Sequence, residues 1–210
     1  MAGAHNKSIA NVTAAIVISL LTGCASPRYF VDGGLKDVDV SQIERLERPR
    51  PVQLLFAFKI RGLVDTRTSE ALEAEVARVV TTSGLFAAVD EAPAAGGAIL
   101  NVSVDFLPDT GSEVSRGVAA GLTLGLVGST RKDPILCTLD YIAAPAQDKL
   151  TATAEHAIYV PLGIIDARPK GIILAKSRVD AWRIATGQSI TAGLRDLSHS
   201  PAFRQQAQTP

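Results

Sequence analysis

The chain has 210 residues, of which 21 are Lys or Arg and 21 are Asp or Glu, so its net charge at neutral pH is zero. Nucleic-acid-binding proteins normally carry a basic excess or a basic stripe, and this balance argues against that class. Apolar residues make up 47% of the chain and aromatic residues only 5%. The length therefore suits one domain with a single core built mainly from Val, Leu, Ile and Ala.

Residues 1–23 have the features of an export signal. Lys7 precedes an apolar run from Ile9 to Leu21, and small residues follow that run. A charged start, a short apolar segment and small residues before a cleavage point are typical of secretory signals. The run has about thirteen residues, fewer than a membrane-spanning helix needs.

The sequence Leu-Thr-Gly-Cys at residues 21–24 resembles the lipobox of bacterial lipoproteins. The resemblance implies that the chain is cut before Cys24 and that Cys24 carries the acyl chains, including palmitate. Several acyl chains anchor a protein firmly, whereas one does so only marginally. Ala25 follows Cys24, in place of the aspartate that favours the inner membrane in enteric-type lipoproteins. The resemblance thus implies the periplasmic face of the outer membrane, with the inner membrane as the alternative.

Residues 24–50 are predicted to form a flexible tether, because they combine several Pro and Gly residues with many charges and little apolar periodicity. A single domain is predicted for 51–197, and a disordered tail for 198–210. Cys137 lies in an apolar, strand-like run and is predicted to be a buried, unreactive thiol.

The order of elements in the domain predicts an α/β (α+β) sandwich. Strands are expected at 52–60, 85–91, 98–107, 134–144 and 149–159, and a helix from about residue 68 to Gly84. Later segments at 177–184 and 189–197 are also ordered, the second as a helix. We therefore expect a mixed or antiparallel sheet of about 4–5 strands with one main helix packed on one face. The strand–helix–strand–strand order at the start of the domain resembles lipoprotein domains of the curli-secretion and penicillin-binding-protein-activator type. The chain also resembles other proteobacterial envelope lipoproteins.

Residues 117–128 have no charge, and Gly117, Gly121 and Gly125 recur at every fourth position. One interpretation is a buried helix or hairpin that packs closely on the sheet. The other is an apolar surface that contacts a membrane or a partner, since small residues at this spacing allow close backbone approach in an apolar medium. Basic residues flank the segment and suit anionic lipid head groups. The contact residues of this second hypothesis are Arg116, Gly117, Gly121, Leu122, Leu124, Gly125, Leu126, Arg131 and Lys132. A phosphate loop is rejected, because Lys132 follows Thr130 instead of preceding a hydroxyl residue.

No residue pattern predicts catalysis, a metal site or a cofactor. His156 is predicted to be a partly buried structural residue whose side chain points away from that of Glu155. An enzyme would be favoured only if Asp105, Asp109, Glu113 and His156 met in one pocket. We therefore expect a non-catalytic, lipid-anchored outer-membrane lipoprotein that binds a partner or the membrane in envelope assembly or maintenance. The alternatives are a structural envelope lipoprotein and, less favoured, a periplasmic hydrolase.

Overall fold

The computed structural model of the chain describes residues 27–94, 96–108, 129–145, 147–162 and 170–208. The strands are β1 (Tyr29–Val31), β2 (Val52–Ile60), β3 (Leu63–Val64), β4 (Val89–Asp90), β5 (Ile99–Phe106), β6 (Ser129–Ile142), β7 (Leu150–Leu162) and β8 (Ile173–Ala175). The helices are the 3-10 turn η1 (Val40–Gln42) and the α-helices α2 (Thr66–Thr82), α4 (Arg178–His199) and α5 (Pro201–Gln208).

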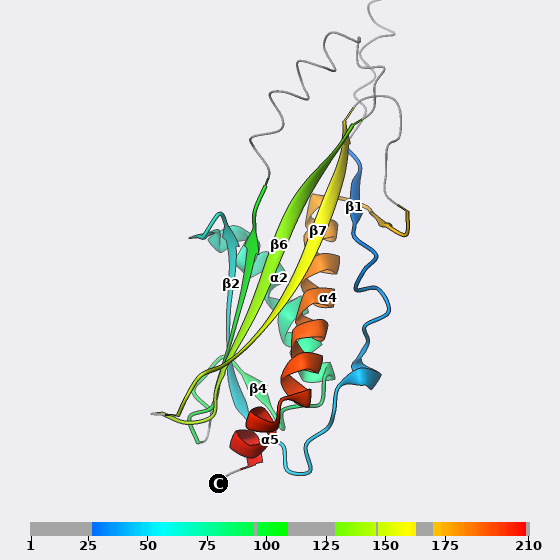
Figure 1. Cartoon of the computed structure of the whole chain (residues 1–210). Helices are drawn as coiled ribbons and strands as arrows, with labels where there is room; N and C mark the ends of the chain where they lie inside the picture. Colours follow the sequence, from blue (N-terminus) through cyan, green and yellow to red (C-terminus); the bar gives the residue numbers. More distant parts are fainter. Residues whose placement is uncertain (1–26, 95, 109–128, 146, 163–169, 209–210) are drawn as a thin grey trace, which may run out of the picture.

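All strands belong to one mixed sheet of eight strands, in the order β3-β2-β5-β6-β7-β1-β8, with β4 paired to β2. The pairs β2–β5 and β2–β4 are parallel, and the other pairs are antiparallel. Helix α2 connects β2 to the parallel strands β4 and β5, and α2 and α4 lie on the same face of the sheet (Figure 1). The predicted α+β class is therefore confirmed. The expected 4–5 strands and single main helix are too few, because the short strands β1, β3 and β8 were not expected and α4 is much longer than the helix expected at 189–197.

Helix α2 forms close to where the sequence places it. The Asp65 side chain accepts a hydrogen bond from the backbone N–H of Thr68 at 2.8 Å and so caps the first turn. Apolar residues three and four positions apart face the core, namely Leu72, Val76, Val79 and Val80. Gly84 has a φ of +68°, the left-handed conformation that ends many helices. The residues after it are mostly not a strand, since Leu85 and Phe86 turn into the core and only Val89–Asp90 pair.

Helix α4 is continuous across the two segments that the sequence separates. Its N-cap Ser177 accepts a hydrogen bond from the N–H of Asp180, whose carboxylate accepts one from the N–H of Lys176. The helix interior contains Thr186, Gly187 and Ser189, residues that favour helices poorly. It forms because α4 packs against both the sheet and its neighbour α2, and small side chains allow this close approach. Tertiary packing thus outweighs local propensity.

The predicted tether at 24–50 is wrong for its described part. Tyr29–Val31 form β1, which pairs with β7 on one side and with β8 on the other. Further along, Ile43 and Leu46 are buried in the core. These apolar residues are too sparse to show a periodicity in the sequence. Their side chains nevertheless pack into the core and so hold this segment against the domain.

The predicted disordered tail is also wrong for its described part. Residues 201–208 form α5, and Phe203 and Ala207 are buried. The Phe203 ring makes edge-on contacts with Tyr141 and Phe86, with ring centroids 4.8 and 6.3 Å apart. Two apolar residues one turn apart are enough to fix this short helix, but they give a weak sequence signal.

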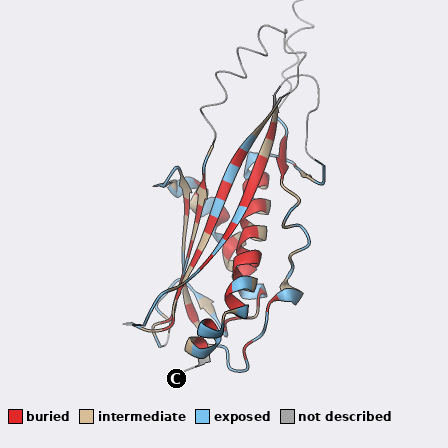
Figure 2. Ribbon diagram, viewed as in Figure 1, coloured by how far each residue is buried: buried red, intermediate tan, exposed pale blue. Residues whose placement is uncertain are grey.

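The two faces of the sheet differ in what covers them. Residues that alternate along each strand face α2 and α4 and form the core, as the banding of β6 and β7 in Figure 2 shows. Trp182 of α4 packs there against Phe58 and Phe106. The opposite face, here called the open face, carries Lys132, Pro134 and Leu136 of β6 and Thr151, Thr153 and Glu155 of β7, which are exposed. No described helix packs on that face.

The thiol of Cys137 is fully buried on the helix side of β6, as predicted. Burial raises its pKa to about 12, because a thiolate would be desolvated there. In a Cys24→Ser variant, where Cys137 is the remaining cysteine, we expect no reaction with a thiol reagent at pH 8 until the protein unfolds. Labelling measured across a urea titration should follow the unfolding curve. Rapid labelling of the native protein would contradict this burial.

Candidate functional site

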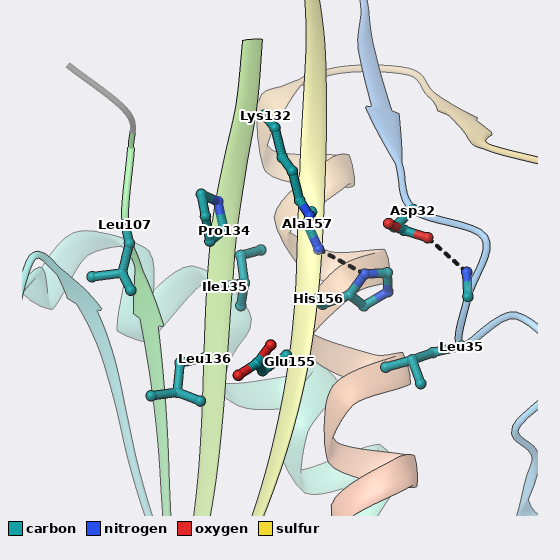
Figure 3. Close-up of a pocket in the computed structure, with 11 residues that line it drawn as sticks. Asp32, Leu35, Leu107, Lys132, Pro134, Ile135, Leu136, Glu155, His156 and Ala157 are labelled. Atoms are coloured by element: carbon teal, nitrogen blue, oxygen red, sulfur yellow. Dashed lines mark hydrogen bonds between the residues drawn. The ribbon is translucent and has the colours of Figure 1, made fainter. Parts of the chain in front are cut away.

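A depression of about 510 Å³ lies on the open face at the point where β1 leaves β7. Its lining comes from four parts of the chain: the turn after β1, the end of β5, β6 and β7. The residues are Asp32, Gly34, Leu35, Leu107, Lys132, Pro134, Ile135, Leu136, Glu155, His156 and Ala157 (Figure 3). We call this depression the fork pocket.

Strand register explains why these residues meet. The N–H of Leu107 donates to the carbonyl of Pro134, Pro134 pairs with Ala157, and the N–H of Asp32 donates to the carbonyl of Ala157. These four residues thus form one row across β5, β6, β7 and the end of β1. Small or flat side chains in the middle of the row leave a shallow floor. Leu136 and Glu155 form the next row and border the pocket.

Asp32 fixes the end of β1 against β7. One of its carboxylate oxygens accepts a hydrogen bond from the N–H of Gly34 at 2.8 Å, and the other accepts one from the Tyr159 hydroxyl at 3.0 Å. Partial burial, and then the hydrogen bond to Asp32 and its charge, raise the pKa of Tyr159. The phenol therefore stays protonated and remains a donor. This arrangement turns the chain away from β7 at Gly34.

His156 belongs to the other face of β7. Its Nδ1 accepts a hydrogen bond from the N–H of Ala157, so Nε2 carries the proton and donates to Oε1 of Gln188 at 2.7 Å. Burial lowers the pKa of His156, although the bond to Gln188 and the charge of Asp32 oppose that shift. The ring is therefore a neutral link between β7 and α4. This confirms the prediction of a structural histidine that points away from Glu155.

The lowered pKa of His156 predicts a loss of stability in mild acid. The unfolded chain binds a proton at this ring near pH 6.5, whereas the folded chain resists it. The contribution of the buried ring to the free energy of unfolding is complete above that pH and decreases as the pH falls below it. In His156→Gln, we expect the stability difference between pH 7.5 and pH 5 to be smaller than in the wild type. Urea unfolding at several pH values measures this difference. If the free energy of unfolding depended on pH equally in His156→Gln and in the wild type, the prediction would be wrong.

The predicted contact residues fall into two groups. Cys24 and the residues Arg116, Gly117, Gly121, Leu122, Leu124, Gly125 and Leu126 lie outside the described part of the chain. Of the remaining two, Lys132 is exposed and lines the fork pocket. Arg131 instead binds Asp133, with 2.9 Å between Arg131 Nε and an oxygen of a carboxylate that is only 1% exposed. The Arg131 charge is thus largely neutralised.

The described residues do not bring together the carboxylates and histidine that would favour an enzyme. Asp105 pairs with Leu136 and lies on the open face, whereas His156 pairs with Ile135 and faces α4. Asp109 and Glu113 lie outside the described residues. Within the described ranges, no group of three His, Cys, Asp or Glu residues is placed to hold a metal ion.

Sequence reasoning missed most of the fork pocket. Asp32 and Leu35 were assigned to the tether, although Tyr29-Phe30-Val31 just before them has high β-propensity. Alternate residues of β6 also point to opposite faces of the sheet, a pattern that the sequence from Lys132 to Cys137 could have predicted. Lys132, Pro134 and Leu136 share the open face, and Asp133, Ile135 and Cys137 share the other. Which other strands complete the pocket depends on the pairing order, which is not encoded locally.

Comparisons with known proteins place the chain in no family. No protein-family model matches it, and no curated protein matches its sequence. Among solved structures it is similar to a PelC variant dodecamer from Paraburkholderia phytofirmans, with 13% identity over 88% of this chain and 100% of that chain, and a TM-score of 0.33. A likeness at this level carries no argument about function. Separately, none of the helices in the described ranges has the length and hydropathy needed to cross a bilayer.

Proposed function

We propose that this chain is a lipoprotein, anchored through acyl chains on Cys24 to the periplasmic face of the outer membrane. In this proposal it is not an enzyme. It binds a partner protein, or the membrane itself, in the assembly or maintenance of the cell envelope. The export signal at 1–23 and the lipobox-like sequence that ends at Cys24 support the anchor.

The distance between Cys24 and the domain carries the proposal. Strand β1 begins at Tyr29, five positions after Cys24 (29 − 24 = 5). The five steps of chain from Cys24 to Tyr29 span at most about 18 Å when fully extended. An acylated Cys24 would therefore hold the sheet close to the lipid surface. The end of the sheet where β1 begins, here called the anchor-proximal end, would face that surface.

Other chain segments reach the same end of the sheet. Strand β6 begins there at Ser129 and β7 ends there at Leu162, and β5 points toward the same end but stops at Phe106, just before the row that contains Asp32. The ends of β5 and β6 flank residues 117–128, the segment for which the sequence suggests contact with a membrane or a partner. That its described flanks lie toward the start of β1 supports a binding role at the membrane surface.

Replacing Cys24 with serine tests the anchor. We expect Cys24→Ser in the full-length chain to abolish incorporation of labelled palmitate and to move the protein out of the membrane fraction. Metabolic labelling measures the first effect. Fractionation on a density gradient measures the second and separates outer from inner membrane.

Cys137→Ala is the matched control, because Cys137 is buried and should keep both the label and the membrane location. Palmitate labelling that persists in Cys24→Ser would refute the proposed anchor.

A further inference from the structure

Among the described residues, no strand pairs with the lower part of β7 on the side away from β6. Strand β1 covers β7 only around Ile158 and Tyr159 and at the hydrogen bond to Ala157. After Asp32 the chain turns away, and Figure 1 shows it running down the far side of α4. β7 continues beneath this point through Glu155, Thr153 and Thr151, which are exposed. We call residues 151–155 the β7 edge.

The hydrogen-bond phase of the ladder shows which backbone groups point outward at this edge. The carbonyl of Ala157 accepts from Asp32, and its N–H donates to the His156 ring, so neither group bonds to β6. In an antiparallel pair such residues alternate with residues that bond to the neighbouring strand. The β6–β7 register runs without interruption from Ser129↔Leu162 to Tyr141↔Leu150. The N–H and C=O groups of Thr151, Thr153 and Glu155 must therefore point away from β6, as those of Ala157 do.

No hydrogen bond joins these outward groups to another described residue. Three consecutive outward positions thus present donors and acceptors in the pattern that an additional strand requires. Such an edge is a template for pairing with another chain. β1 shows that this edge of β7 can accept a strand, since β1 is a short extended segment that already pairs with the upper part of the same edge.

The charges beside the β7 edge indicate the partner's character. Glu155 is exposed, and neither it nor Asp32 has a cation within ion-pair distance among the described residues. Asp140 lies lower on the open face and is already paired with Lys149 at 3.1 Å. The carboxylates of Glu155 and Asp32 flank the fork pocket, where Leu35 and Leu136 provide an apolar wall. Lys132 also lines this pocket, so a strand placed here would meet two carboxylates and one ammonium group, a net negative charge, at its upper end.

We propose that the β7 edge binds an extended segment of a partner protein as an added strand in line with β1. A basic side chain of that segment lies near Glu155 and Asp32, and an apolar side chain enters the fork pocket. Backbone hydrogen bonds supply most of the affinity, and the pocket and the charges supply selectivity, as in other cases of strand addition. This inference rests on the partner-binding half of the proposed function and does not depend on the lipid anchor.

Amide exchange in the full-length protein in detergent micelles tests the free edge directly. The N–H groups of Ala152 and Ala154 belong to the β6 ladder and should exchange slowly, whereas those of Thr153 and Glu155 should exchange fast. Adding a synthetic heptapeptide that alternates valine with lysine should slow exchange at Thr153 and Glu155. Slow exchange at both positions in the free protein would overturn the proposal, because the edge would already be covered.

Two variants separate backbone pairing from side-chain effects. Thr153→Pro removes one outward N–H but no bond of the β6 ladder, so we expect it to bind the peptide about tenfold more weakly, as the loss of one hydrogen bond would cause. Thr153→Val keeps that N–H and should bind as the wild type does. Equal binding by Thr153→Pro and Thr153→Val would overturn strand addition.

A charge exchange keeps the test valid if Thr153→Pro does not fold. The wild type should prefer the lysine peptide to an otherwise identical glutamate peptide by up to about fivefold, the range of an exposed ion pair. Glu155→Lys should reverse this preference. If neither peptide protects the edge amides but anionic lipid vesicles do, the surface is a membrane contact and the proposal is wrong. Failure here leaves the palmitate result at Cys24 unaffected.

Discussion

Replacing Phe203 with alanine is expected to lower the free energy of unfolding by about 3–5 kcal/mol, the usual cost of removing a buried aromatic ring. Phe203 is completely buried, and its ring lies edge-on to Tyr141 and Phe86. Its loss would leave a cavity under α5 and detach that helix from the sheet. Urea or thermal unfolding measures the effect, provided that the transition has two states.

Arg204→Ala is the control on the same helix. Arg204 is exposed and forms an ion pair with Glu44 at 2.8 Å, an interaction worth at most about 1 kcal/mol at the surface. We expect its effect to be within that range. If Phe203→Ala were as mild as Arg204→Ala, residues 201–208 would be dispensable, as the sequence-based expectation of a disordered tail implied.

The two glycines within α4 should respond in opposite directions to alanine. A Cβ on Gly193 would lie 2.7 Å from Cδ1 of Leu139 and 3.3 Å from its Cδ2, in the interior of the domain. Overpacking of this kind costs about 1–3 kcal/mol. Alanine regains up to about 1 kcal/mol from its better helix propensity. The expected net result for Gly193→Ala is a lower free energy of unfolding, by up to about 2 kcal/mol.

Gly187→Ala provides the matched comparison, because it makes the same chemical change six positions earlier in the same helix. Its Cβ would meet the flexible end of Glu75 at 3.3 Å and Cγ2 of Val79 at 3.7 Å. These contacts need little adjustment, so the propensity gain should dominate and stability should rise by up to about 1 kcal/mol. Equal effects of the two substitutions in urea unfolding would show that Gly193 is not required for the close packing of α4 on β6.

The regular parts of the fold could be predicted from the sequence. Val52–Ile60 is apolar and β-rich, and Ile99–Phe106 alternates apolar with polar residues, so both strands have their expected places within one residue. Helix α2 has a capping residue, an apolar face and a terminal glycine, each a local signal. These elements carry their information within a window of about twenty residues.

The remaining elements depend on contacts between distant parts of the chain. β1 is three residues long and forms because β7 and β8 are on either side of it. Residues 178–188 of α4 have poor helix formers that packing overrides. The fork pocket joins residues near position 32 to residues near 107, 134 and 156, and only the strand order brings them together. The same holds for the β7 edge, which exists because β1 ends where it does.

The position of β1 also imposes an order on folding. Phe30 pairs with Tyr159, which is 129 residues later in the chain (159 − 30 = 129). If the N-terminus leaves the cytoplasm first, β1 is among the first segments to arrive outside, yet it has no strand to pair with until β7 follows. Pairings this distant in sequence form slowly, because a long loop must close first. An N-terminus already held at a lipid surface would restrict the search that β1 must make. Attachment to lipid and completion of the sheet would then be successive steps of one maturation process.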